Sequence, residues 1–159
     1  MSVDVKDALS RSVLFGDFPS GELDKLAKIA HEHQLSPGSE LFRSGDSGDE
    51  LFVLAMGTVR VLKAGARGDL EEIAVLGSGS HFGEMALVYA GHRRSPTVEA
   101  QEMSQLVGLK QSDLESLCQG DETLGHHFYK TLAVNLARRL SNTSDDAAHF
   151  KSMALKRRG

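Results

Sequence analysis

The stretch ELFVLAMGTVRVLKAG, residues 50–65, contains two short apolar runs, and each run ends in a glycine. Runs of this length that are rich in valine, leucine and phenylalanine are typical of β-strands. Glycine adopts positive φ angles at little steric cost, so Gly57 and Gly65 suit tight turns. The stretch therefore predicts two strands joined by a glycine turn.

The same texture continues on both sides of this pair. Further short runs are EEIAVLGSG (71–79), PTVEA (96–100) and QLVGL (105–109), and glycines recur between the runs at Gly38, Gly45, Gly68, Gly77 and Gly79. Regular short strands with glycine turns are typical of sandwiches, barrels and jelly rolls, which avoid bare sheet edges. A β-roll is predicted for about residues 34–110.

Helical periodicity precedes this region. In SGELDKLAKIAH, residues 20–31, the apolar positions at helical spacing are Leu23, Leu26, Ala27 and Ala30. Ser20 is the expected N-cap of this helix. We expect N-terminal helices over about residues 4–33.

Helical periodicity also returns after the β-region. SDLESLC (112–118) opens with a capping box of Ser112 and Glu115, and a longer helix capped by Asp121 follows Gly120. Its apolar positions recur first every fourth residue and then at spacings of three and four: Leu124, Phe128, Leu132, Leu136, Leu140, Thr143, Ala147, Phe150 and Ala154. This spacing favours a two-helix seam, formed either on the chain's own barrel or in a dimer. Helices are expected over about 112–146, with a helix extension and basic tail over 147–159.

Composition excludes several classes of protein. The chain has 159 residues, of which 40% are apolar, enough for one domain with appended helices. Its net charge of −4 provides no electrostatic footprint for nucleic acid. The apolar runs are far shorter than the roughly 20 residues that span a bilayer. The single cysteine, Cys118, and the absence of an export signal indicate a cytoplasmic protein without a membrane anchor.

The sequence contains no nucleophile with an adjacent base, so no enzymatic activity is expected. HEH at residues 31–33 has the histidine spacing of cupin metal sites, which share the jelly-roll fold. It falls at the end of a predicted helix, where positions i and i+2 diverge by about 200°. We therefore expect no metal site.

The chemistry is concentrated in FGEMALVYAGHRRSPT, residues 82–97. The first amides of a brief helical segment, around Gly83 to Leu87, are unpaired by the helix and attract anions. An arginine a few residues later supplies the fork-shaped donor that a phosphate prefers, and Ser95 adds a hydroxyl. Glu84 would repel a phosphate unless the ligand also offered a hydroxyl donor. An anion joined to a sugar hydroxyl is what a cyclic nucleotide presents, so these residues predict a cyclic nucleotide as the ligand. The alternative is a structural Glu–Arg ion pair.

This stretch resembles the phosphate-binding cassette of the cyclic nucleotide-binding domain family, commonly F-G-E-L-A-L, a variable loop and then R-x-A-T/S. The resemblance extends through LFRSGDSGDELFVLAMGTVRV, residues 41–61, and covers about residues 14–146. It implies a mainly β fold with flanking α-helices: an eight-stranded jelly-roll β-barrel whose long C-terminal helix closes over the nucleotide. The implied domain spans residues 1–146.

The resemblance also implies a role for each residue of the cassette. Glu84 would accept the ribose 2′-hydroxyl, and Arg94 would pair with the cyclic phosphate while Arg93 stays a solvated loop charge. Ser95 would add a donor to the phosphate. Pro96 stands where the family has a small residue, and because proline lacks an amide donor, weakened or altered affinity is expected.

Other positions are assigned by the same resemblance. Backbone contacts would come from Gly83 and Ala86, and Met85 between them is counted among the ligand-binding residues. The base and sugar would be lined by Val61, Ile73 and Ala74. His81 stands where an acidic residue is common and His92 where kinase-type domains have proline, and both are interpreted as loop residues. No metal cofactor is implied.

A second resemblance lies in ARRLSNTSDD, residues 137–146, which is similar to the central helix of the catabolite activators within this family. That helix is their dimer interface, so a homodimer through the C-terminal helix is implied. Thr143 and Ser144 would meet the exocyclic amine of adenine, and Arg139 could pair with Glu84. Few residues follow, which leaves no room for the helix-turn-helix of those activators, and no direct DNA binding is expected.

The resulting functional hypothesis is a regulatory module whose ligand is cAMP, with cGMP as the second choice, and which signals to a separate effector protein by rearranging its C-terminal helix. The alternative is a nucleotide-free module of the same fold, used for dimerisation or docking. Such modules commonly lack the glutamate or the arginine of the cassette, whereas this chain has both Glu84 and Arg94.

Overall fold

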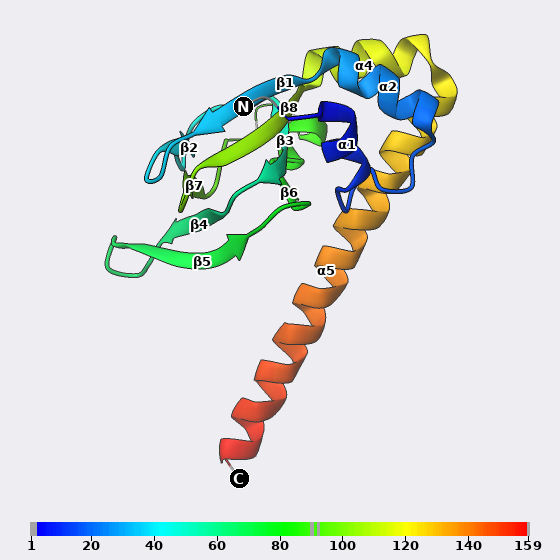
Figure 1. The fold of residues 1–159 in the computed structure, drawn as a ribbon. Coiled ribbons are helices and arrows are strands. Elements are labelled where there is room, and N and C mark those ends of the chain that lie inside the picture. The colour runs from blue at the N-terminus through cyan, green and yellow to red at the C-terminus, as the bar shows by residue number, and fades with distance from the viewer. Residues whose placement is uncertain (1–2, 90, 92, 159) are drawn as a thin grey trace.

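Helices lie at both ends of the chain and strands in its middle (Figure 1). The computed structural model describes residues 3–89, 91 and 93–158, with the side chains of residues 143–150 and 156–158 outside that description. The N-terminal helices are α1 (Val5–Ser10) and α2 (Ser20–Ile29), and the C-terminal ones are α4 (Gln111–Gly120) and α5 (Glu122–Arg158). The short helix α3 (Met85–Val88) interrupts the strand region.

Two four-stranded antiparallel sheets make up the β-region of the described chain. The first has the order β1 (His31–Leu35), β8 (Ser104–Lys110), β3 (Glu50–Met56) and β6 (His81–Phe82). The second has the order β2 (Glu40–Phe42), β7 (Thr97–Ala100), β4 (Val59–Ala64) and β5 (Leu70–Leu76). Eight strands with helices before and after them confirm the predicted jelly-roll-like fold.

Strand β3 is buried on both faces, which explains its uninterrupted apolar run. Leu51 and Val53 belong to the core shared with the helices, whereas Phe52 and Leu54 belong to the core inside the roll. Alternate residues of a strand point to opposite faces, so one strand serves both cores. Gly57, which ends the run, has a φ of 103°, as expected for a glycine turn.

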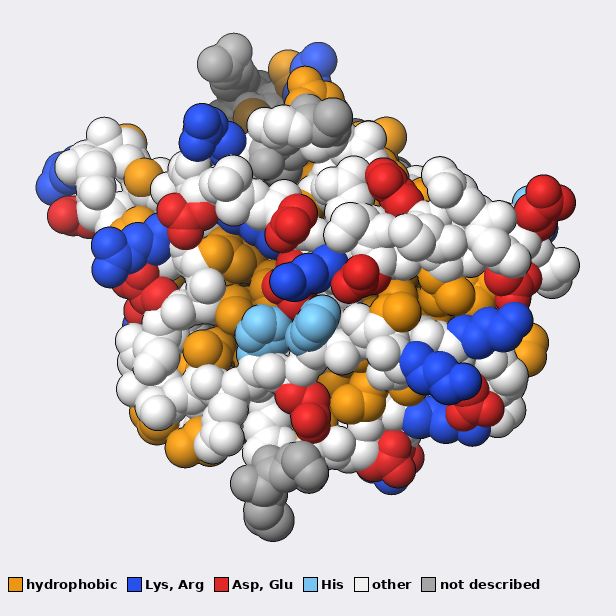
Figure 2. Space-filling model, turned by 90° about the horizontal axis from the view of Figure 1, so that it is seen from above, with side chains coloured by type: hydrophobic (Ala, Val, Ile, Leu, Met, Phe, Trp, Pro, Cys, Tyr) orange, Lys and Arg blue, Asp and Glu red, His pale blue; other side chains and the backbone are white. Residues whose placement is uncertain are grey.

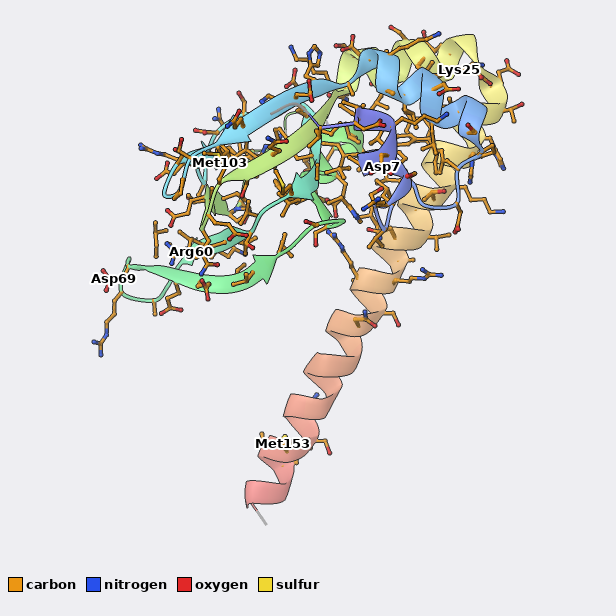
Figure 3. All side chains as sticks on the ribbon, viewed as in Figure 1. Asp7, Lys25, Arg60, Asp69, Met103 and Met153 are labelled. Carbon is orange, nitrogen blue, oxygen red and sulfur yellow. The ribbon has the colours of Figure 1, made fainter. Side chains whose placement is uncertain are left out.

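The two halves of α5 have different surroundings. Its first half packs into the helical core, where Leu124, Phe128 and Leu132 are at most 1% exposed. Leu140 is already 69% exposed. Met153 lies on the distal part of the helix, which runs clear of the strands (Figure 3). Of the predicted seam, the side chains of Thr143, Ala147 and Phe150 lie outside the described residues.

Two predicted helix caps are wrong and one is confirmed. Ser20 and Ser112 both lie inside the first turn of their helices, after Pro19 and Lys110, and no side chain caps either helix. A serine at these positions is past the residue whose oxygen can accept the first free amides. Asp121 does cap α5, because its Oδ1 accepts the amide of Leu124 at 3.1 Å.

The predicted helical boundary at residue 33 is also wrong. Helix α2 ends at Ile29, and residues 31–35 form β1, which pairs with β8 from His31 to Leu35. Strand pairing satisfies the backbone donors and acceptors of this segment, which periodicity along the chain does not reveal. His31 and His33 therefore lie on the same face of a strand and do not diverge as they would on a helix.

Candidate functional site

A cavity of about 620 Å³ opens at the end of the β-roll, beside α3 and α5. It is lined by Phe42, Val61, Leu76, His81, Phe82, Gly83, Glu84, Met85, Arg94, Ser95, Pro96, Val98 and Arg139. The lining combines an apolar wall with two arginines and a glutamate. A more open groove of about 840 Å³ between α4 and α5 has no arginine in its lining. The first cavity is the one suited to a ligand with an apolar part, an anion and a hydroxyl.

Arg94 is the buried cation of the cavity, with 5% of its surface exposed. Its Nη2 donates to the carbonyl oxygen of Glu50 at 2.7 Å and its Nη1 to that of Gly83 at 3.4 Å. The guanidinium carbon lies 4.4 Å from the centroid of the Phe42 ring. Among the described residues, no carboxylate lies within ion-pair distance of this guanidinium. Its positive charge is therefore available to an anion in the cavity.

Burial and nearby carboxylates act on Arg94 in opposite directions. Burial lowers the pKa of Arg94, and the negative charges of Glu50, Asp49 and Asp46 oppose that effect. A guanidinium keeps its charge in proteins in either case. The acidic residues lower the positive potential at Arg94 without pairing with it directly.

Two glycines make room for the Arg94 side chain. A Cβ at Gly48 would overlap Nε and the guanidinium of Arg94, and a Cβ at Gly83 would lie 2.6 Å from Nη1. Gly83 also has a φ of 88°, which L-residues rarely adopt. Sequence reasoning identified Gly83 but missed Gly48. The sequence does show that Gly48 closely follows Gly45. It does not show that the side chain of Arg94 occupies the space where a Cβ of residue 48 would lie.

The neighbours of Arg94 are placed differently around it. Its own backbone is held from both sides, because its amide donates to the carbonyl of Asp46 at 2.7 Å and its carbonyl accepts the amide of Gly45 at 2.6 Å. Arg93 is exposed, and its Nη1 donates to the carbonyl of Gly45 at 3.1 Å. Ser95 and Pro96 both line the cavity. Of the two arginines, Arg94 lines the cavity, and its pairing with an anion stays a prediction.

Glu84 immediately precedes α3 and is 3% exposed. Its Oε1 accepts a hydrogen bond from Nη1 of Arg139 on α5, which confirms the predicted ion pair. Burial lowers the pKa of Arg139, whose side chain is half exposed. The pair joins the cassette to the long helix at the rim of the cavity.

The interpretation of His81 as a loop residue is wrong. His81 begins β6, pairs with Val53 of β3 and is 4% exposed. Its Nε2 lies 3.0 Å from Oδ1 of Asn135 and 3.3 Å from Nη2 of Arg139, both on α5. Burial lowers the pKa of His81, the guanidinium of Arg139 lowers it further, and the bond to Asn135 opposes both. His81 is therefore favoured as a neutral contact between β6 and α5. His92 lies outside the described residues.

The expectation of free amides throughout residues 83–87 is wrong for two of them. The amide of Ala86 donates to the carbonyl of Gly83 at 3.2 Å, and that of Leu87 donates to the carbonyl of Glu84 at 3.0 Å. Ala86 is buried and does not line the cavity. Met85 does line it and is 42% exposed. Both amides lie at the start of α3 and donate three residues back, which uses amides that a regular α-helix would have left free.

The residues predicted to line the base and sugar are only partly brought to the cavity. Val61 lines it, and Ala74 is the cross-strand partner of Val61 but is not part of the lining. Ile73 is the extra residue of a bulge in β5 and is 56% exposed. Contacts of Ile73 and Ala74 with a base stay predictions, as do those of Thr143 and Ser144, whose side chains lie outside the described residues.

Other kinds of site find less support in the structure. Within the described residues, no three His, Cys, Asp or Glu side chains are grouped so that they could hold a metal ion. His31 and His33 have separate carboxylate neighbours, Asp113 and Glu50. On the face shown in Figure 2, acidic and basic side chains are interspersed and form no broad basic patch. None of the described helices is long and apolar enough to cross a bilayer.

Comparison with known proteins agrees with this geometry. A cyclic AMP receptor protein of Thermus thermophilus is 35% identical over 130 residues, which are 81% of this chain and 57% of that protein. The N-terminal domain of a transcriptional regulator from Streptomyces coelicolor superposes with a TM-score of 0.75 at 28% identity, covering 89% of this chain and 95% of that one.

The regulatory domain of Toxoplasma gondii PKA, solved with cAMP, superposes with a TM-score of 0.63 at 26% identity, covering 70% of this chain and 42% of that one. This chain thus spans little more than half of the Thermus protein and less than half of the Toxoplasma one. Residues 32–121 match the cyclic nucleotide-binding domain family, and the chain belongs to that family.

Proposed function

We propose that this protein binds cAMP, and less favourably cGMP, and that it regulates a separate effector protein in response. The observation that carries the proposal is the placement of Arg94 and Glu84 in one cavity, both at most 5% exposed. A buried guanidinium suits the cyclic phosphate, and a buried carboxylate suits the ribose 2′-hydroxyl. The apolar wall, which includes Val61 and Leu76, suits the sugar and base.

The known relatives support the same ligand. The Thermus protein is named as a cyclic AMP receptor, and the Toxoplasma domain was solved with cAMP. Serine at position 95 also favours cAMP, because kinase-type cGMP sites often carry threonine there. Pro96 beside it supplies no amide donor, so we expect weaker affinity than in a site with alanine.

Helix α5 is the proposed output of the domain. A ligand that hydrogen-bonds to the Glu84 carboxylate contacts the same group that accepts the hydrogen bond from Arg139 of α5. Binding therefore favours one arrangement of the helix over another, which is what a regulatory ligand requires. The role is regulatory rather than enzymatic, in the cytoplasm, with α5 available to an effector or to a second copy of the chain.

Isothermal titration with cAMP, cGMP and 5′-AMP tests this function. We expect submillimolar binding of cAMP, weaker binding of cGMP, and little binding of 5′-AMP, which has no cyclic phosphate. The variant Arg94→Leu should lose binding while keeping its thermal unfolding transition, and Arg93→Leu is the matched control that should bind as the parent does.

If neither cAMP nor cGMP binds with submillimolar affinity, the proposal is rejected. That result would leave the nucleotide-free docking or dimerisation module as the function of this fold. Unchanged affinity in the Arg94 variant would instead show that another group holds the phosphate.

A further inference from the structure

His33 and Glu50 make a contact across a strand. His33 is on β1 and Glu50 on β3, and β8 lies between them in the sheet. The His33 Nε2 nevertheless lies 2.8 Å from Oε2 of Glu50. The contact passes over Gly108 of β8, where a Cβ would overlap the Glu50 carboxylate and lie 2.9 Å from the His33 Nε2. The missing side chain of Gly108 is what allows the pair to form.

This pair is next to the buried cation of the cavity. The backbone carbonyl of Glu50 accepts the 2.7 Å hydrogen bond from Nη2 of Arg94. Phe52, the next residue of β3 on the same face, contacts both groups, with its ring 5.4 Å from the ring of His33 and 5.7 Å from the guanidinium carbon of Arg94. The Glu50 side chain is only 12% exposed, so water screens its charge poorly. His33, Glu50 and Arg94 therefore form one group of charges inside the roll.

We propose that His33, acting through Glu50, sets the strength with which the Arg94 site holds an anion. This inference rests on the proposed nucleotide-binding function. With a proton on His33, the imidazolium offsets the carboxylate of Glu50. Without that proton, the carboxylate lowers the positive potential at Arg94 and opposes a bound phosphate. His33 is a positioning residue in this scheme, because it does not touch the cavity itself.

The direction of the effect follows from the groups that face His33. The bond to Glu50 raises the pKa of His33, and its negative charge acts in the same direction, whereas burial and Lys110 of β8 lower it. The carboxylates of Asp46 and Asp49 also lie near Arg94, on the loop before β3. A cyclic phosphate diester keeps one charge throughout the range in which histidine titrates. Affinity for the nucleotide should therefore fall as the pH rises through the raised pKa of His33.

Titration calorimetry with cAMP between about pH 5.5 and 8.5, the range in which histidine titrates, measures this dependence. The parent protein should lose about threefold to tenfold in affinity across the range, as expected for one partly screened charge. His33→Gln keeps a donor for Glu50 but cannot gain a proton. Above pH 6.5, where the lowered pKa of His81 leaves that residue neutral, the affinity of this variant should not change with pH and should stay near the parent's high-pH value. His31→Gln is the matched control on the same strand and should keep the parent's slope.

A second variant separates charge from damage to the fold. Glu50→Gln removes the carboxylate and should bind cAMP more tightly than the parent at high pH. Its slope should move to lower pH, because His33 loses the partner that raises its pKa. Weaker binding in Glu50→Gln, or an unchanged slope in His33→Gln, would overturn the inference.

NMR titration of the His33 ring tests the charge coupling without nucleotide. Arg94→Met removes a positive charge near His33 and should raise its pKa, whereas Arg94→Lys should leave that pKa close to the parent's. An unchanged pKa in Arg94→Met would overturn the inference. If the coupling is observed but no cyclic nucleotide binds at any pH, the inference about the charge group is supported and the proposed function is rejected.

Discussion

Arg139 of α5 donates to the carboxylate of Glu84, so the long C-terminal helix and the ligand cavity share one ion pair. Glu84 is 3% exposed, whereas the side chain of Arg139 is half exposed. The carboxylate thus depends on its partner more than the guanidinium does, since a buried charge without a partner is costly.

Arg139→Met should therefore destabilise the protein by about 1–2 kcal/mol, below the cost of breaking a fully buried pair because Arg139 is partly solvated. Urea unfolding at neutral pH measures the change. Arg138→Met, at the exposed neighbouring position, is the control and should change stability by less than about 0.5 kcal/mol. Equal effects of the two substitutions would contradict a specific role for the ion pair.

Gly48→Ala should weaken cAMP binding by about tenfold or more, because the added methyl group displaces the Arg94 guanidinium, at a cost in stability of about 1–3 kcal/mol. Calorimetry with cAMP and a thermal melt measure the two effects. Gly77→Ala is the control, since a Cβ there meets nothing within 4 Å and its φ is not in the left-handed region. Retained affinity in Gly48→Ala would show that Arg94 adapts without loss of its position.

Acid should destabilise the contact between β6 and α5 through His81. Its pKa in the folded protein is lowered from 6.5, so its contribution to stability is complete above the unfolded pKa and is lost as the pH falls toward the folded pKa. The free energy of unfolding, measured by urea titration at several pH values, should therefore decrease less at acid pH in His81→Gln than in the parent. His126→Gln, an exposed control on α5, should keep the parent's decrease. If both variants follow the parent's curve, His81 does not titrate in this way.

His33 should act with the opposite sign. Its folded pKa is raised above 6.5, so its contribution is complete below the unfolded pKa and is lost as the pH rises through the folded value. The parent should lose stability as the pH rises through the folded pKa of His33, and His33→Gln should lack this loss. Urea unfolding over the same pH series measures the difference. A loss removed on the acid side instead would contradict the assigned shift.

Thr143→Ala should weaken cAMP about threefold to tenfold, the value of one hydrogen bond, and leave cGMP nearly unchanged. The expectation follows from the resemblance that assigns Thr143 to the exocyclic amine of adenine. Competition titrations with both nucleotides measure the ratio. Ser141→Ala, at an exposed position on the same helix, should leave the ratio as it is. Equal loss for both nucleotides would show that Thr143 does not distinguish the bases.

Features set by near neighbours in the chain were predictable. The strands of β3 and β4, the turn at Gly57 and the cap at Asp121 depend on patterns that span a few residues. The cassette of Glu84 and Arg94 was likewise recognised from its residue types and spacing. Local patterns failed at Ser20, where helix α2 begins one residue earlier than expected, and at His31, where pairing with β8 replaces the expected helix.

The remaining features depend on the assembled fold. His33 reaches Glu50 across the intervening strand β8 only because β8 has a glycine, Gly108, at the point of contact. His81 is buried only because α5 returns to β6 after 54 residues, and Gly48 matters only because Arg94 is folded back over it. The physical reason is the same in each case. Residue type and period determine local conformation and which chemistry is available, whereas burial, charge coupling and close approach are created by the pairing of segments distant in the chain.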